Sequence, residues 1–364
     1  MPFDDRKQLI SKIEELRGGR RLLCFLNFDR VSDPGVQGLS TQFHAEVKEA
    51  FFRILKESKP EKGVDLFLYT RGGDTNSVWP LVSVIREFDP DFEVIAPFRC
   101  HSSGTLAALG ARRIHLGPLS ELSPIDPSTG NQFNPVDPAN QANRLAIGVE
   151  DVTAFRDFIA LQLVKDESKL KEDSFRPFLE RLVGAVHPLA LGNVQRVVKQ
   201  INQLAEKLLA LHPVQGENTK EVIANLTSAF HSHLHMINRD EASRILGTRI
   251  SFMDNGLADA SDALLRSYED DFNLRQKFYL ASFLGNDLTK DVRFVGGVAE
   301  AAARSYLFVT SGVLRQTTKL PPNVQVQIPP GQPMPLVQGL PRDIQFEIAA
   351  QGWKHNEHPQ GVTK

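Results

Sequence analysis

Two short segments, about thirty residues apart, carry residue types that together could do acyl-transfer chemistry. A glycine pair at the end of a parallel strand exposes backbone N–H groups that a side chain would block. A serine at the next strand-to-helix turn presents its hydroxyl beside them, so we expect an oxyanion hole that faces a nucleophile. The segments are Tyr69-Thr70-Arg71-Gly72-Gly73-Asp74 and Cys100-His101-Ser102-Ser103-Gly104-Thr105-Leu106.

The elements that must position these segments follow from the pattern of apolar residues. Residues 64–69 and 94–98 predict two buried strands, and residues 77–88 predict an amphipathic helix between them. An earlier apolar run over 21–28 predicts another strand, and a long helix is expected over 41–57. Strands that are apolar on both faces and alternate with helices predict an α/β fold, with a parallel sheet flanked by helices.

Ser102 is the best candidate nucleophile on local grounds. The small residues after it predict a helix whose N-terminus would stabilise negative charge beside the serine. The plain alternative is that Ser102 or Ser103 only caps this helix, which is a common role for serine. The Gly72-Gly73 pair has a plain alternative too, namely a tight connection between a strand and a helix.

Three motifs, in this order along the chain, resemble the serine dehydrogenase proteinase family. That family belongs to the larger Clp protease, signal peptide peptidase A and crotonase fold group, and its usual patterns are Thr-Pro-Gly-Gly, Ser-Ala-Gly-Thr and Gly-Pro-Ile-Asp-Pro. Arg71, Ser103 and Ser123 depart from these patterns, and the resemblance covers residues 64–256. The motifs are Thr70-Arg71-Gly72-Gly73-Asp74, Ser102-Ser103-Gly104-Thr105 and Ser123-Pro124-Ile125-Asp126-Pro127.

The resemblance implies a fold with a Clp/crotonase-like core and a role for each motif. Ser102 would be the nucleophile, and the backbone N–H groups of Gly73 and Ser103 would be the oxyanion donors, with Gly72 as a further candidate. A serine hydroxyl needs a base to remove its proton. In the Clp relatives this base is a histidine whose position falls near Ile125 or Asp126 here, where the sequence has no histidine.

Four other residues are therefore candidates for the base. His233 is our first choice, because it stands at a family-like Ser-His pair shortly before a helix start, and a histidine has a suitable pKa. His187 is second and His115 third, while Lys165 would play the part of the lysine of signal peptide peptidases. Asp126 could orient the base, although the prolines on both sides of Ile125-Asp126 fit a purely structural turn nearly as well.

The pattern divides the chain into three parts. Residues 1–147 are expected to form the α/β core with the nucleophile, and 148–280 a helical elaboration that completes this core. Residues 281–364 are expected to be a C-terminal extension, in which a short strand over 306–309 precedes a Pro- and Gln-rich arm over 321–341.

Composition excludes several classes of protein. The 364 residues are 41% hydrophobic and 24% charged, and a net charge of -2 gives no footprint for nucleic acid. Cys24 and Cys100 are the only cysteines, which excludes a disulfide framework and favours a reducing compartment. No apolar run approaches the ~18 residues of a membrane span. We expect a cytoplasmic protein with no membrane span, no cofactor and no metal.

The sequence as a whole predicts a serine peptidase that hydrolyses peptide bonds through an acyl-enzyme on Ser102. Its partners would be a protein or peptide substrate and, by analogy with the fold group, further copies of itself in a homo-oligomer. Two other functions stay open. One is a crotonase-type acyl-thioester enzyme, which uses the oxyanion hole without a serine nucleophile, and the other is a catalytically inactive Clp-like scaffold that recruits a partner.

Overall fold

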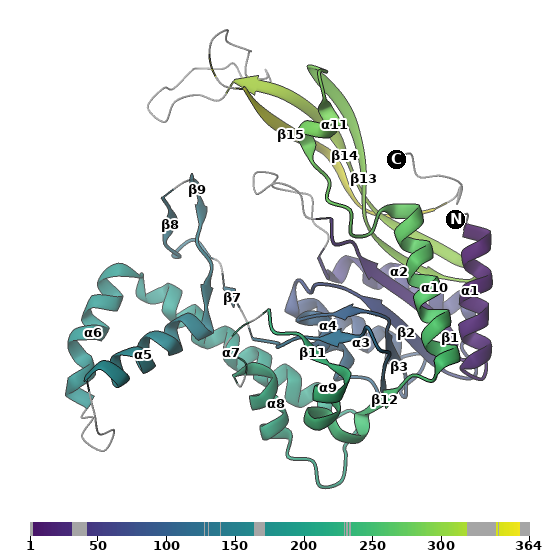
Figure 1. Ribbon diagram of the computed structural model, residues 1–364, viewed down its shortest axis with the longest axis horizontal. Coiled ribbons are helices and arrows are strands. Elements are labelled where there is room, and N and C mark those ends of the chain that lie inside the picture. Colours follow the sequence, from purple (N-terminus) through teal and green to yellow (C-terminus); the bar gives the residue numbers. More distant parts are fainter. Residues whose placement is uncertain are drawn as a thin grey trace.

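The computed structural model describes residues 3–30, 42–126, 128–129, 131–138, 140–163, 172–228, 230, 232, 234–318, 340 and 342–356. Its centre is an eight-stranded sheet with the order β12-β5-β3-β2-β1-β13-β14-β15 (Figure 1). The strands from β12 to β1 run parallel, and β13, β14 and β15 continue the sheet beyond β1 in antiparallel fashion. The strands are β1 (Arg21–Asn27), β2 (Val64–Tyr69), β3 (Glu93–Ala96), β5 (Ile114–Leu116), β12 (Ile250–Phe252), β13 (Thr289–Ala301), β14 (Arg304–Thr318) and β15 (Arg342–His355).

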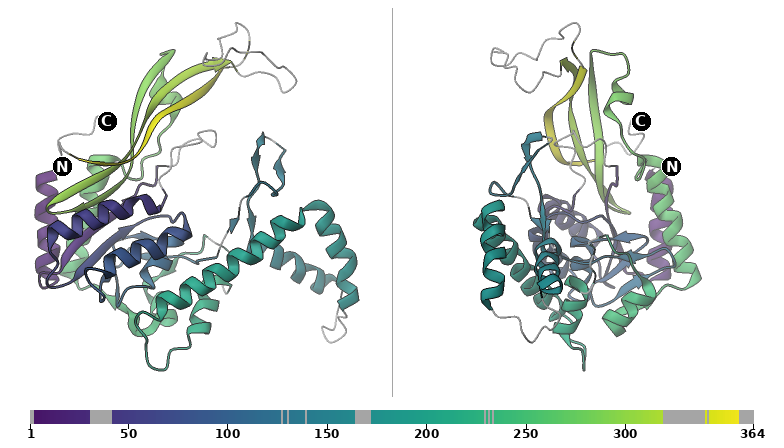
Figure 2. Two further views of the ribbon diagram at one scale, coloured as in Figure 1. Left: turned by 180° about the vertical axis from the view of Figure 1, so that it is seen from behind. Right: turned by 60° about the vertical axis from the view of Figure 1, so that its left-hand side comes forward.

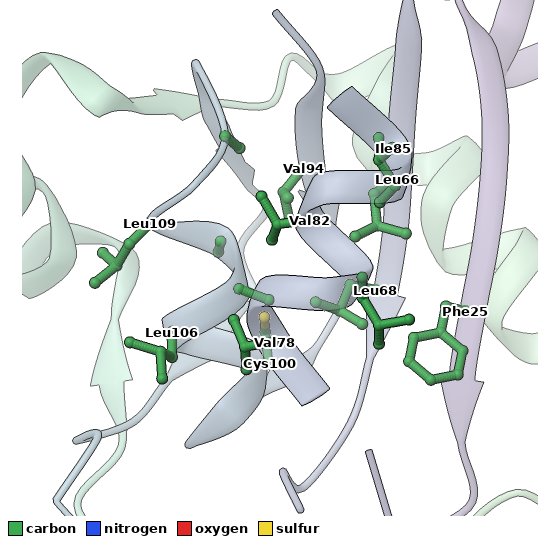
Figure 3. Close-up of a cluster of buried hydrophobic side chains, with 14 of the residues drawn as sticks. Phe25, Leu66, Leu68, Val78, Val82, Ile85, Val94, Cys100, Leu106 and Leu109 are labelled. Carbon is green, nitrogen blue, oxygen red and sulfur yellow. The ribbon is translucent and has the colours of Figure 1, made fainter. Parts of the chain in front are cut away.

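Helices cover both faces of the parallel half of the sheet, so every residue of β2 is buried. On one face, α1 (Phe3–Leu16) packs against α10 (Asn255–Phe272) over a core that includes Leu22 and Leu26. On the other face, a larger core includes the alternate β1 residues Leu23 and Phe25, as the period of a strand requires (Figure 3). The helices of that face are α2 (Lys48–Ser58), α3 (Val78–Arg86), α4 (Ser103–Ala108), α7 (Pro188–Leu209), α8 (Thr219–Thr227) and α9 (Arg239–Leu246).

A small second sheet holds the segments around the predicted serine turn. Its order is β11-β6-β4, in which β4 runs parallel to β6 and β11 runs antiparallel to it. The bounds are β4 (Arg99–Cys100), β6 (Glu121–Leu122) and β11 (Ile237–Asn238).

An arm projects from the core between β6 and α7, as Figures 1 and 2 show from several sides. It contains two helices and two short antiparallel pairs, β7 with β10 and β8 with β9. The elements of the arm are β7 (Ser128–Thr129), β8 (Val136–Asp137), β9 (Asn140–Arg144), β10 (Ile147–Gly148), α5 (Val149–Leu163) and α6 (Glu172–Ala185).

The structure differs from the sequence-based expectations at two places. The helix expected over 41–57 begins only at Lys48, because Phe43 pairs with Gly73 as extended backbone and a 3₁₀ turn over Ala45–Val47 follows. The expected parallel sheet is mixed, and the expected short strand over 306–309 is part of β14, one of three long strands. Most of the Pro- and Gln-rich stretch 321–341 lies outside the described residues.

One short helix, α11 (Leu280–Leu284), lies near the C-terminal strands. It packs on β13 and β14 through its own apolar cluster, in which Leu280 and Leu284 meet Val292 and Leu314. None of the helices in the described ranges is both long enough and apolar enough to cross a membrane.

Candidate active site

The glycine turn and the serine turn start side by side, because the end of β2 pairs with β4. The Thr70 N–H donates to the Arg99 carbonyl at 2.9 Å, and the His101 N–H donates to the Thr70 carbonyl at 3.0 Å. Gly104 permits α4 to approach this junction, since a Cβ there would lie 2.5 Å from Thr70 Cγ2. The topology therefore brings residues 70–74 and 101–104 to one place at the carboxyl edge of the sheet, which is where α/β folds bind ligands.

Ser102 adopts a backbone conformation that few residues other than glycine adopt. Its φ of 51° and ψ of −113° lie in a region that is costly for a residue with a Cβ, by ~1–3 kcal/mol. Gly72 lies directly against it, since a Cβ at Gly72 would come within 2.7 Å of Ser102 Cβ and 3.2 Å of Ser102 Oγ. A glycine at position 72 is therefore required by the closeness of the serine side chain.

The backbone of Gly73 faces the serine helix. Phe43 donates its N–H to the Gly72 carbonyl and accepts the Asp74 N–H, both at 2.9 Å, so Gly73 turns its own polar groups to the other side. There its carbonyl accepts the Ser103 hydroxyl at 2.9 Å. Since the N–H and C=O of an extended residue point the same way, the Gly73 N–H also faces α4.

Some backbone N–H groups near Ser102 already donate a hydrogen bond, and others do not. The Gly72 N–H donates to Thr70 Oγ1 at 3.0 Å, so it is engaged within its own turn. Within the described part of the chain, neither the Gly73 N–H nor the Ser103 N–H donates to another group. The Ser103 side chain is fully buried and its hydroxyl is used by Gly73, whereas Ser102 is only partly buried.

Ser123 fixes the serine turn through hydrogen bonds. The Ser102 N–H donates to Ser123 Oγ at 2.7 Å, and the Ser123 hydroxyl donates onward to the Pro124 carbonyl at 3.0 Å. The Ser123 N–H donates to Thr105 Oγ1, whose hydroxyl donates to the Cys100 carbonyl at 2.7 Å. This buried chain of hydrogen bonds fixes the start of α4 against β6.

The charged side chains beside the glycine turn neutralise one another. Asp29 accepts from Arg71 Nε at 2.7 Å and also pairs with Arg99, and Arg99 Nε donates to Glu121 at 3.2 Å. Burial, together with the charge of Asp29, raises the pKa of Tyr69 to about 12, so this phenol stays protonated at neutral pH. The surroundings of Ser102 are thus polar but nearly balanced in charge.

The residues proposed as bases are placed very differently from one another. His115 is buried, and its Nε2 contacts Glu93 Oε2 at 2.6 Å toward the amino end of β3, which is the opposite edge from the serine turn. His187 caps α7, where its Nδ1 accepts the Leu189 N–H and its ring stacks on Phe133 at 4.8 Å. His233 and Lys165 lie outside the described residues.

Asp126 is buried and has its own partners, and the adjacent Ile125 N–H donates to the Leu226 carbonyl at 2.8 Å. Among the residues that the structure describes, none forms a hydrogen bond with Ser102 Oγ. The described segment that follows position 233 nevertheless reaches this region, because Ile237 of β11 pairs with Leu122 of β6.

Two residues of the site, Thr70 and Ser123, stand in the quoted motifs but received no role from the sequence. Thr70 accepts the Gly72 N–H through its side chain, and Ser123 accepts the Ser102 N–H. A signal existed for Ser123, since it stands where the family pattern has a glycine without a side chain. Thr70 stands at the threonine of the Thr-Pro-Gly-Gly pattern, but that pattern alone does not show that its hydroxyl binds the Gly72 N–H.

No family model matches the sequence. An uncharacterized protein of Methanocaldococcus jannaschii is 29% identical over 85 residues, which are 23% of this chain and 30% of that protein. The chain thus spans less than a third of the length of the curated relative that it matches.

Two solved structures resemble the fold distantly. A mutant of a membrane-bound stomatin-specific protease, in complex with a substrate peptide, is 13% identical with a TM-score of 0.33, and the match covers 58% of this chain and 71% of that chain. A ClpP1 mutant from Listeria monocytogenes is 10% identical with a TM-score of 0.35, over 67% of this chain and 99% of that one.

Proposed function

We propose that this protein is a serine peptidase, with a Clp/crotonase-like core, that cleaves peptide bonds through an acyl-enzyme on Ser102. The observation that carries the proposal is the strained Ser102 backbone beside the N–H groups of Gly73 and Ser103, neither of which donates to another described residue. Strain of this kind persists where the surroundings enforce it, and it is concentrated at functional sites. Here Gly72 leaves room for the Ser102 side chain, and Ser123 fixes the Ser102 N–H.

The proposed chemistry uses each group for one task. Ser102 Oγ attacks the scissile carbonyl, and the oxygen of that carbonyl becomes negatively charged in the tetrahedral intermediate. The N–H groups of Gly73 and Ser103 would donate to this oxyanion, and an interaction of this type typically contributes ~10²–10³-fold in rate. Gly72 is left out of the oxyanion hole, because its N–H already donates to Thr70.

His233 remains our candidate for the base. Its support is the pairing of Ile237, four residues further on, with Leu122, the neighbour of the Ser123 that binds the Ser102 N–H. His187 serves as a matched control, because the contacts of its ring are with Leu189 and Phe133. His233→Ala should slow the reaction of Ser102 with a serine-directed probe by ~10²-fold or more, and His187→Ala should not.

A fluorophosphonate probe tests the nucleophile. The native protein and Ser103→Ala should be labelled, and Ser102→Ala should not be, with folding of each variant checked by circular dichroism. Labelling that persists in Ser102→Ala, or disappears only in Ser103→Ala, would overturn the assignment. A native protein that is never labelled would instead favour the inactive scaffold.

We further propose that the protein is a homo-oligomer that assembles through its arm. Large apolar side chains stand exposed on this arm and on the adjacent start of α7, and clustered exposure of this kind marks interaction surfaces. They are Phe133, Val136, Leu145, Phe155, Phe158, Leu161, Leu179, Val183 and Leu189.

The assembly is tested by light scattering. The native protein should have a mass that is a multiple of the monomer's, and Phe158→Asp with Leu161→Asp should reduce it. Leu234→Asp is the control, since Leu234 is 80% exposed but lies outside the arm. A monomeric native protein, or an oligomer that the arm variant leaves intact, contradicts this part of the proposal.

A further inference from the structure

A cavity of about 600 Å³ lies apart from the candidate active site, between the end of α10, the helix α11 and β13. Its walls are Arg30, which follows β1, the connection from α10 to α11, and residues 291–295 of β13. Figure 1 shows α11 beside β13 and β14, away from α4. The volume falls within the range of ~300–1,000 Å³ that small-molecule sites occupy.

Arg30 is a partly buried cation in this cavity. Its Nε donates to the Gln276 carbonyl at 3.2 Å, and its guanidinium carbon lies 5.5 Å and 5.1 Å from the ring centres of Phe278 and Phe294. The two rings hold the guanidinium group in place. Among the described residues, no carboxylate pairs with Arg30, and its terminal nitrogens have no hydrogen-bond partner.

Burial lowers the pKa of the Arg30 guanidinium, and the charge of Glu269 only partly opposes this effect. Glu269 is itself paired with Arg275 at 2.8 Å. A guanidinium group carries five N–H donors and stays charged in proteins, so desolvating it without a carboxylate is costly. An anion that enters the cavity would supply the missing partner.

The charges of the cavity wall also favour an anion. Lys277 and Arg293 line it in addition to Arg30, and neither forms an ion pair within the described ranges. Of the two carboxylates in the wall, Asp271 is already bound by Arg6, which leaves Asp291 as the other one. Cations therefore outnumber the carboxylates that could compete with a ligand.

Aromatic side chains form a large part of the remaining wall. The ring centres of Phe278 and Phe283 are 5.2 Å apart, and those of Phe278 and Phe294 are 5.4 Å apart. Tyr279 also lines the cavity and is 45% exposed. Such a wall offers apolar contact to the body of a ligand whose charged end reaches Arg30.

We propose that this cavity binds a carboxylate with an aromatic or apolar body, with the carboxylate on the Arg30 guanidinium and the body against the phenylalanine rings. An arginine binds a carboxylate through two parallel hydrogen bonds, which distinguishes an acid from its amide. This site is independent of the proposed peptidase function, and neither proposal depends on the other.

The test is a calorimetric titration of the full-length protein with N-acetyl-phenylalanine and with its neutral amide. The acid should bind with saturation, and the amide should bind at least about tenfold more weakly. Arg30→Met keeps the length of the side chain but removes the charge, and it should weaken binding of the acid by about tenfold or more. Arg266→Met is the control, because Arg266 is an exposed residue of α10 paired with Asp262.

Several outcomes would overturn this proposal. They are the absence of saturable binding to the native protein, equal binding of acid and amide, and unchanged affinity in Arg30→Met. If inorganic phosphate displaces the acid at equal concentration, the site recognises a bare anion and the assigned apolar contact is wrong. Should Arg30→Met not fold, Arg30→Lys keeps the charge but cannot form the two parallel hydrogen bonds, and it should weaken binding of the acid several-fold.

Discussion

Ser123→Ala is the substitution that most directly probes how the fold holds the candidate nucleophile. The hydroxyl of Ser123 accepts the Ser102 N–H at 2.7 Å and donates to the Pro124 carbonyl at 3.0 Å, and the residue is only 2% exposed. Alanine removes both hydrogen bonds and leaves the two backbone groups unpaired. At about 1 kcal/mol for each bond, the free energy of unfolding should fall by about 2 kcal/mol.

The same substitution should also slow the reaction of Ser102. The strained conformation of Ser102 is held partly by this N–H contact, and a loss of about 1 kcal/mol from one conformation reduces its population, relative to competing conformations, about fivefold. We therefore expect the rate of fluorophosphonate labelling to fall about fivefold. Ser58→Ala is the control, because the Ser58 hydroxyl bonds only the Ile54 carbonyl in α2, and its cost should stay within about 0.5 kcal/mol.

Urea denaturation and the labelling rate, measured on the same preparations, separate the two effects. If Ser123→Ala loses stability but reacts as fast as the native protein, Ser123 supports the fold without positioning Ser102. If the stability also stays unchanged, the hydrogen-bond argument itself is refuted.

Two other predictions concern the central sheet, one at the site and one at the opposite edge. Gly104→Ala places a methyl group 2.5 Å from Thr70 Cγ2 and should lower the free energy of unfolding, measured in urea, by ~1–3 kcal/mol. Adding Thr70→Ser removes that methyl contact and should recover most of the loss. Strictly additive costs of the two substitutions would contradict the close approach. Burial alone would raise the pKa of Glu93, but the hydrogen bond and charge of His115 and the charges of Arg17 and Arg20 outweigh it, so the pKa lies well below its ordinary value of 4.5. Because the folded carboxyl has the lower pKa, its contribution to stability is present above about pH 4.5 and is lost as the pH falls further. The difference in the free energy of unfolding between the native protein and Glu93→Gln should therefore narrow in acid. A difference that widens in acid would contradict this prediction.

The sequence was sufficient for the part of the fold that local pattern determines. The strand over 64–69 stands as predicted in β2, because a short run that follows Gly63 and is apolar except for Asp65 strongly favours a buried strand. The adjacency of Gly72 and Ser102 also followed from the sequence, since the carboxyl ends of neighbouring strands meet at one edge.

The remaining features depend on contacts between distant residues. Phe43 reads as the start of a helix but is held extended by its pairing with Gly73, thirty residues later. The strand β14 contains many polar residues and most residues of β15 are exposed, so their pairing with one another and with β13 does not show as apolar periodicity. The ion pair of His115 with Glu93 likewise follows from strand register and not from any motif.

The central claim is that Ser102 attacks while Gly73 and Ser103 hold the developing oxyanion. A crystal structure of the protein after reaction with a fluorophosphonate tests it most directly, because the phosphoryl oxygen of the adduct takes the place of that oxyanion. We predict a bond from phosphorus to Ser102 Oγ, with one phosphoryl oxygen ~2.7–3.1 Å from the N–H groups of Gly73 and Ser103. An adduct on Ser103, or one whose phosphoryl oxygen contacts neither N–H group, would contradict the claim.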